Sequence, residues 1–268
     1  MSTNFLTHSS RTDRVVSRLQ LTLISVLIAI VTACGTETAA GPLAPTGPQG
    51  RVRFVNVIND TTRGRVNAIL ERVPFGVNVT YTQSTPATLA APNTALYAAI
   101  LAGDRTLVLK RTADTSTTVA TIPFTMAVSQ DRSVYAIGGA GGAAVTSFVT
   151  TDTNPVAPAT QARVRVVQLS PTAGNVDVFV TAVGADLAAA TPTLSNVAYK
   201  GVSGYLLLNA GTHQIRAVPA GTAPAARAAS VTINLASLAL RGATGRTIVL
   251  ADNTTGGAPL RAFVLSDR

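Results

Sequence analysis

From Arg51 onward, short apolar stretches rich in Val, Ile, Leu and Thr alternate with Gly, Pro, Asn and Asp. This spacing is typical of β-strands joined by turns, and the region lacks a sustained helical period. In the first half of the chain the pattern predicts strands at residues 52–58, 66–70, 77–82, 96–101, 106–111, 119–126, 133–137 and 144–150. We therefore expect an all-β fold.

The same order of segments occurs twice. RVRFVNV, which begins at Arg51, recurs as RVRVVQL from Arg163, and GRVNAIL recurs as GNVDVFV. LYAAILAG, which ends at Gly103, corresponds to GYLLLNAG, which ends at Gly211, and GGAAVTSFVTTD corresponds to GGAPLRAFVLSD. Self-similarity at a nearly fixed spacing indicates a duplicated unit. The sequence therefore predicts two homologous domains.

The repeats predict a division into residues 51–152 and 161–268, joined by a Pro-containing linker at 153–160. Each repeat has the length of an immunoglobulin-like or transthyretin-like β-sandwich. We expect Gly103 and Gly211 to lie in turns with positive φ. The segments at 183–195 and 86–94 share little beyond alanine and proline, so either they form recognition loops or they are idle connectors.

The residues before the repeats resemble an export signal. A basic segment at 11–18 precedes an apolar run at 19–33, which is short for a membrane span but suits a signal peptide. The sequence VTAC, which ends at Cys34, resembles the lipobox of bacterial lipoproteins. The resemblance implies a lipoprotein signal peptide at 1–33 and a lipid anchor, with acyl chains such as palmitate, on Cys34. An ordinary secretory signal or an uncleaved anchor is the alternative.

Residues 34–50 are rich in Pro, Gly, Thr and Ala and have no apolar period, so we expect a flexible tether. Gly35 follows Cys34 where lipoproteins retained in the inner membrane often carry aspartate. Its presence favours the outer membrane, with either the periplasmic or the outer face exposed.

The formal charge is +9, and removal of residues 1–33 with their three arginines and one aspartate would lower it to +7. The arginines occur singly or in spaced pairs such as Arg51/Arg53 and Arg163/Arg165, which favours a solvated basic surface over a nucleic-acid site. With Cys34 as the only cysteine, no disulfide within the chain is available.

Three motifs of the second repeat, R-V-R-V-V-x-x-S-P, N-V-D-V-F-V and S-G-Y-L-L-L-N-A-G-T, resemble the bacterial envelope family called domain of unknown function 4397. The first repeat departs from them, since Asn67 stands where the second has Asp177. The resemblance implies an exported β-sandwich, often in tandem, without an established activity. We expect Tyr97 and Tyr205 to pack inside the sandwiches with their hydroxyl groups on the backbone, as in a tyrosine corner.

Residues that could take part in catalysis or bind a phosphate or metal occur without the partners that these roles require. His213 is the only histidine after the signal segment, and Ser203 lies in G-V-S-G, which lacks the final glycine of a nucleophile elbow. The glycine-rich segments at 138–142 and 252–257 predict hairpin loops rather than phosphate-binding loops. The only glutamates are Glu37 and Glu71, and metal-ligand spacings are absent. We therefore predict no catalytic, cofactor-binding or metal residue.

Two hypotheses for the function follow. The first is a non-enzymatic, lipid-anchored envelope protein that binds an envelope glycan or protein and needs no cofactor. The alternative is a hydrolase of an envelope or extracellular polymer that uses aspartates, of which Asp177 and Asp186 form the closest pair in the early part of one repeat.

Overall fold

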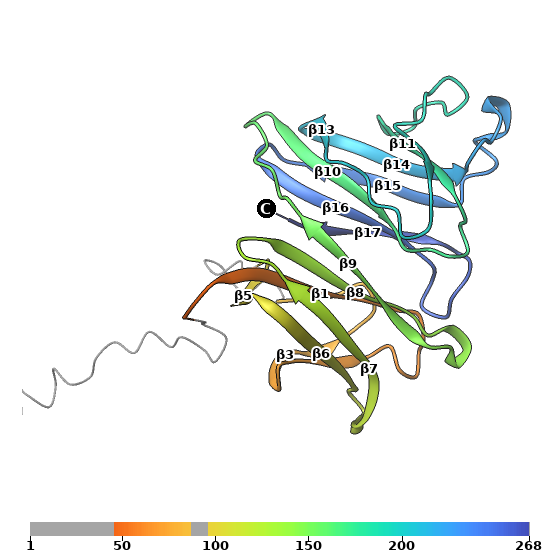
Figure 1. Cartoon of the computed structure of the whole chain (residues 1–268). Helices are drawn as coiled ribbons and strands as arrows, with labels where there is room; N and C mark the ends of the chain where they lie inside the picture. Colours follow the sequence, from red (N-terminus) through yellow and green to blue (C-terminus); the bar gives the residue numbers. More distant parts are fainter. Residues whose placement is uncertain (1–45, 87–95, 268) are drawn as a thin grey trace, which may run out of the picture. The chain divides into compact units, whose positions relative to one another are not determined.

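The computed structural model describes residues 46–86 and 96–267. Cys34, the predicted signal peptide and most of the predicted tether lie outside these residues. The all-β prediction is confirmed, since the described residues form strands and two short 3-10 turns, with no α-helix (Figure 1). None of the helical segments in this part of the chain is long and apolar enough to cross a membrane.

The strands run in chain order. In the first half they are β1 (Gln49–Ile58), β2 (Val66–Leu70), β3 (Val73–Val79), β4 (Ser84–Thr85), β5 (Ala98–Leu101), β6 (Gly103–Arg111), β7 (Asp114–Met126), β8 (Asp131–Gly138) and β9 (Val145–Asp152), with the 3-10 turn η1 (Ala140–Gly142) before β9. In the second half they are β10 (Gln161–Gln168), β11 (Val176–Thr181), β12 (Leu194–Val197), β13 (Leu206–Asn209), β14 (Gly211–Pro219), β15 (Ile233–Leu240), β16 (Thr244–Ala251) and β17 (Arg261–Ser266), with η2 (Pro224–Ala226) before β15.

Most predicted strands are present, and two differ for a structural reason. β1 begins inside the predicted tether, because Gln49 and Gly50 pair with β5. The strand predicted at 77–82 is instead β3, which ends at Val79. Asn78 and Thr82 have φ angles of 55° and 69°, so the chain turns where the apolar pattern predicts an extended strand.

The strands form four sheets. Sheet A has the order β4-β1-β8-β9, with β5 also paired to β1, and sheet B has the order β3-β2-β6-β7. In the second half, sheet C has the order β13-β10-β16-β17 and sheet D has the order β12-β11-β14-β15. In sheet A the pair β1 and β8 is parallel, and so is the pair β10 and β16 in sheet C. The same pairing order therefore occurs in both halves of the chain.

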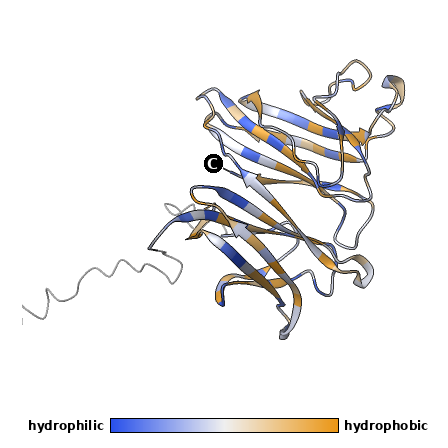
Figure 2. Cartoon of the chain, viewed as in Figure 1, coloured by the Kyte–Doolittle hydropathy of each residue, from blue (hydrophilic) through white to orange (hydrophobic). Residues whose placement is uncertain are grey.

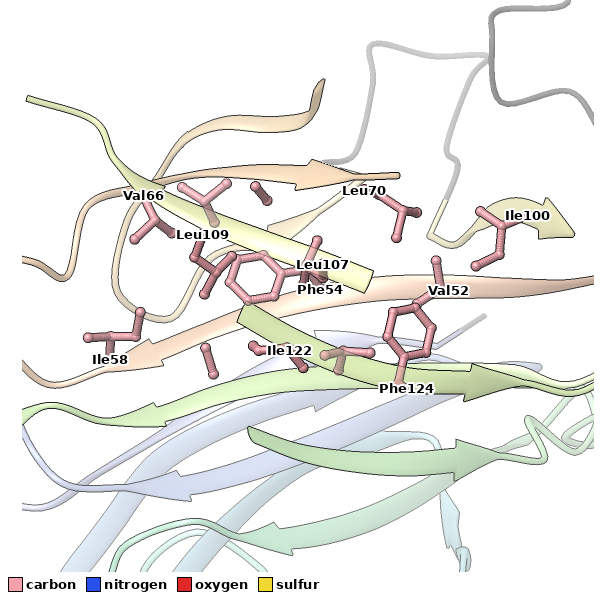
Figure 3. Close-up of a cluster of buried hydrophobic side chains, with 14 of the residues drawn as sticks. Val52, Phe54, Ile58, Val66, Leu70, Ile100, Leu107, Leu109, Ile122 and Phe124 are labelled. Carbon is pink, nitrogen blue, oxygen red and sulfur yellow. The ribbon is translucent and has the colours of Figure 1, made fainter. Parts of the chain in front are cut away.

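Each half has its own apolar core between two sheets. In the first half, Phe54 of β1, Val66 of β2 and Leu109 of β6 are fully buried in one cluster, which Figure 3 shows. In the second half, Val164 and Ile215 belong to the corresponding cluster. Figure 2 shows hydrophobic and hydrophilic residues alternating along many strands, as expected when one face of each sheet lies against a core.

A third apolar cluster joins the two halves. It contains Val55 and Tyr135 from sheet A together with Val167 and Val249 from sheet C, all fully buried. The second faces of sheets A and C therefore cover each other. β1 and β10 are therefore buried on both faces, and the buried positions include the polar residues Arg53 and Asn56 in β1 and Arg165 and Gln168 in β10.

The alternative of a free recognition loop after β11 is wrong for part of that segment. Leu187 is 1% exposed and packs with Phe179 and Val218 on the outer face of sheet D. Arg227 places its guanidinium group 5.1 Å from the centre of the Phe179 ring and donates a hydrogen bond of 2.7 Å to the carbonyl of Ala190. Part of this alanine-rich segment is therefore a cover for the sheet.

The predicted turns are confirmed. Gly103 and Gly211 have φ angles of 109° and 141°, and they begin β6 and β14 directly after the one-residue connections from β5 and β13. The glycine-rich segments at 138–142 and 252–257 connect two antiparallel pairs, β8 with β9 and β16 with β17. Both segments are hairpin connections, as the sequence predicts.

Candidate functional site

Two buried arginines connect the halves of the chain through reciprocal ion pairs. Arg53 of β1 lies 2.7 Å from the carboxylate of Asp267, and Arg165 of β10 lies 2.5 Å from the carboxylate of Asp152. The arginine side chains are 2% exposed and the aspartate side chains are fully buried. Arg53 thus pairs with Asp267, which follows the last strand of the second half. Arg165 pairs with Asp152, which ends the last strand of the first half.

A hydroxyl group joins the arginine of each pair to the aspartate of the other pair. Nε of Arg53 donates to Oγ of Ser133 at 2.6 Å, and Ser133 in turn donates to Asp152. Nε of Arg165 donates to Oγ1 of Thr247 at 2.8 Å, and Thr247 donates to Asp267 at 2.7 Å. Buried charges need such additional hydrogen bonds, because pairing alone does not replace their lost hydration.

The prediction of a solvated basic surface is wrong for Arg53 and Arg165. Their side chains point away from the sandwich core, where an isolated domain would expose them to water. Here sheets A and C cover each other on that face, so the guanidinium groups are enclosed between the two halves. One arginine of each spaced pair, Arg53 or Arg165, is therefore an interface residue.

The tyrosine-corner prediction is also wrong in its hydrogen bonds. Tyr97 donates from its hydroxyl to the Asp152 carboxylate at 2.8 Å, and Tyr205 donates to the side-chain oxygen of Asn154 at 3.0 Å. The guanidinium groups of Arg53 and Arg165 lie 4.7 and 5.1 Å from the centres of the two rings. The tyrosines therefore interact with the buried ion pairs instead of with a backbone carbonyl.

Burial raises the pKa of Tyr97 above its usual range, and the positive charge of Arg53 opposes this shift only in part. Burial likewise raises the pKa of Tyr205. Both phenols therefore stay protonated and act as hydrogen-bond donors at neutral pH.

An open groove of about 950 Å³ lies beside this network. Arg51, Asp131 and Asn154 line it, and Tyr97, Asp152 and Asp267 form part of its wall. The Arg51 side chain is 58% exposed and makes a bidentate contact with Asp131, from Nε at 2.7 Å and from Nη2 at 2.6 Å. The groove therefore presents a fixed, charge-balanced polar surface to solvent.

Asn154, from the segment between β9 and β10, holds the groove together. Its Nδ2 donates to Oδ2 of Asp131 at 2.6 Å, and its Oδ1 accepts the hydroxyl proton of Tyr205. One amide thus connects a groove residue of the first half with a tyrosine of the second. The predicted linker at 153–160 lies between β9 and β10 and contributes directly to the groove.

The residues considered for catalysis have structural contacts. Nε2 of His213 lies 2.9 Å from the carbonyl oxygen of Asn209. Oγ of Ser203 accepts a hydrogen bond from the backbone of Val166 at 2.8 Å and donates to the carbonyl of Gly204. These contacts do not bring a histidine and a serine together.

The two aspartates of the hydrolase hypothesis also bind backbone groups. Asp177 is 7% exposed and accepts the backbone N–H groups of Asn196 and Gly221 at 2.8 and 3.0 Å. Asp186 accepts the backbone N–H of Ala188 at 2.9 Å. Both carboxylates thus stabilise turns.

The described residues contain no group of three or more His, Cys, Asp or Glu side chains that could hold a metal ion. Asp252, in one of the loops considered for calcium, accepts hydrogen bonds from Ser170, from Thr172 at 2.7 Å and from the backbone of Gly257 at 2.9 Å. Its oxygens are therefore used by neighbouring donors.

Comparisons with known proteins give one family. The model described as "Domain of unknown function (DUF4397)" matches residues 50–179, which include sheets A and B, β10 and most of β11. The chain is thus similar to the family that its motifs resemble, in a single matched copy that spans slightly less than half of the sequence. No curated protein matches the chain.

Two solved structures show a distant likeness. One carries the description "Alpha-glucan binding by a streptococcal virulence factor", with 11% identity, coverage of 76% of this chain and 93% of the other, and a TM-score of 0.24. The other is a CBM26 module of Eubacterium rectale Amy13K in complex with maltoheptaose, with 9% identity, coverage of 82% and 97%, and a TM-score of 0.22. With TM-scores this low, neither structure assigns a fold or a ligand to this chain.

Proposed function

We propose that the chain is a non-enzymatic binding and structural module of the cell envelope. It consists of two tandem immunoglobulin-like or transthyretin-like β-sandwich domains, at 51–152 and 161–268, that act as one body. The recurrence of the same strand pairing in sheets A/B and C/D supports this division. The apolar cluster between sheets A and C supports a fixed arrangement of the two domains.

The observation that carries the proposal is the pairing of all four charged side chains that line the groove. Arg51 pairs with Asp131, Asp152 with Arg165, and Asp267 with Arg53. The arginine partners hold these carboxylates, and the hydrogen-bonding groups around them, in fixed positions, as a binding site requires.

The location is part of the same proposal. The lipobox-like VTAC sequence and the Pro- and Gly-rich tether support a protein anchored through lipid on Cys34. Gly35 after Cys34 favours the outer membrane. The partner is an envelope glycan or protein, and the charge-balanced groove gives no support to nucleic acid.

A pull-down tests this function. The full lipidated chain, used as bait in detergent-solubilised envelopes, is expected to retain a specific protein or glycan, identified by mass spectrometry and sugar analysis. The purified chain is expected to release no soluble fragments from envelope polymers. Release of fragments, or retention of no component above an empty matrix, would contradict the proposal.

A further inference from the structure

We propose that the groove beside Tyr97 binds a neutral saccharide, an uncharged ligand with several hydroxyl groups, and that Arg51, Asp131 and Asn154 recognise it. This inference rests on the proposed binding function and adds the place and the class of ligand. Three observations carry it: the rigidity of the polar groups, their balanced charge and the donors and acceptors that are still free.

The polar groups are held before any ligand arrives. Asp131 receives two hydrogen bonds from Arg51 and a third from Asn154, all between 2.6 and 2.7 Å. The guanidinium carbon of Arg51 also lies 5.8 Å from the centre of the Tyr97 ring. Planar guanidinium, carboxylate and amide groups in fixed positions match neighbouring hydroxyl groups of a sugar, and pre-ordering them lowers the entropy lost on binding.

The charge balance disfavours ions as ligands. An anion would meet the carboxylate of Asp131 next to Arg51, with the carboxylates of Asp152 and Asp267 in the same wall. A cation would have to displace Arg51 and Asn154 from the oxygens of Asp131. An uncharged ligand avoids both costs, because it needs neither a new counter-charge nor the loss of an existing pair.

The rim offers hydrogen-bonding groups that the described part of the chain leaves unused. Gln49, Ser129 and Thr153 line the groove and are exposed, and their side chains have no hydrogen bond to the described residues. Arg51 also has an Nη1 group without such a partner. These groups surround the Arg51–Asp131 pair, so a ligand with several hydroxyl groups would satisfy them together.

The test measures binding of neutral oligosaccharides of glucose, galactose and N-acetylglucosamine to the full chain in detergent, by titration calorimetry. Polygalacturonate serves as the anionic probe. We expect at least one neutral probe to bind, with little dependence on salt, because no counterions are released.

Two variants locate the site. Asp131→Asn breaks the bidentate contact, and Arg51→Lys keeps the charge but loses the planar donor pair. Each is expected to weaken neutral-saccharide binding by about tenfold or more. Asp60→Asn is the matched control, because Asp60 pairs with Arg63 at 2.7 Å in a loop that does not line the groove. It is expected to leave binding unchanged, and melting curves check that all three variants are folded.

Three results would overturn the inference: no neutral probe binds at millimolar concentration, binding survives both groove variants, or polygalacturonate binds more tightly and in a salt-sensitive way. A failure of this kind is distinguishable from failure of the proposed function. If the envelope pull-down retains its partner with the Asp131→Asn bait as well as with the native chain, the binding function stands and the groove is not its site.

Discussion

Nη2 of Arg165 donates a hydrogen bond of 2.5 Å to Oδ1 of Asp152, although β10 and β9 belong to different repeats of the sequence. Arg53 and Asp267 repeat this relationship in the opposite direction, 214 positions apart. Each half of the chain thus supplies one arginine and one aspartate to the other. The interface between the two halves is therefore specified by ion pairs between particular residues as well as by apolar contact.

Removal of one carboxylate should show how much the network contributes. Asp152→Asn leaves Arg165 without its counter-charge in a buried place, so we expect the free energy of unfolding to fall by about 3–5 kcal/mol. Urea denaturation at neutral pH measures this loss. Asp60→Asn, in the more exposed pair with Arg63, is the control and should cost no more than about 1 kcal/mol. Equal losses for the two variants would contradict a special role of the buried pair.

For two tyrosines near the network, removal of the hydroxyl group should change the free energy of unfolding in opposite directions. Tyr135 is fully buried and its hydroxyl has no hydrogen-bond partner among the described residues, whereas the Tyr97 hydroxyl donates to Asp152 at 2.8 Å. Tyr135→Phe is expected to raise the free energy of unfolding by about 1 kcal/mol, because an unsatisfied polar group leaves the interior.

Tyr97→Phe is expected to lower the free energy of unfolding by about 1.5–3 kcal/mol, because it removes a hydrogen bond to a charged group. Thermal denaturation of the two variants side by side gives the comparison. A larger loss for Tyr135→Phe than for Tyr97→Phe would show that the two hydroxyl groups have been assigned the wrong roles.

The close packing of the predicted linker gives a third test. A Cβ atom at Gly242 would lie 1.6 Å from the carbonyl oxygen of Ala159, which belongs to the segment between β9 and β10. Gly242→Ala must therefore displace the linker, and we expect a loss of about 1–3 kcal/mol together with faster proteolysis at 153–160. Gly204→Ala is the matched control, since its Cβ would meet no atom within 4 Å. Similar proteolysis of both variants would mean that the linker is not packed in this way.

The strand pattern was predictable from the sequence because it depends on local alternation, but the burial of the arginines was not. Arg53 is covered by residues more than 200 positions away, and a spaced arginine pair in a strand usually indicates a solvated face. A signal was nevertheless present. Both repeats carry R-V-R at the start and an aspartate at the end, so the duplicated charges could have indicated a shared contact.

The sequence contained no comparable signal for the groove. Asp131 and Arg51 are adjacent on neighbouring strands of sheet A, whereas the corresponding arginine of the second repeat, Arg163, faces Gly245. Since only one repeat carries the acidic partner, comparison of the two repeats does not single it out. The two contacts of Asn154 depend on the packing of both halves, so its neighbours in the sequence do not indicate them.

One sequence difference between the two repeats preserves the same structural contact. Asn67 replaces Asp177, and each accepts the backbone N–H of an asparagine with positive φ, Asn78 at 2.9 Å and Asn196 at 2.8 Å. The position needs an oxygen acceptor and does not need a charge. Loss of the carboxylate therefore leaves the irregularity in the adjacent edge strand, β3 or β12, intact.

The last prediction concerns Cys34, which lies outside the described residues. If the VTAC sequence acts as a lipobox, Cys34→Ala should leave an unprocessed precursor that keeps residues 1–33, because cleavage of such signals requires the cysteine. Mass spectrometry of the amino-terminal peptide distinguishes the two forms, and Gly35→Ala is a control that keeps the cysteine. Acyl chains on Cys34 of the native chain would support anchoring, since two or more chains give stable membrane attachment. A mature native chain with an unmodified thiol would instead indicate an ordinary secretory signal.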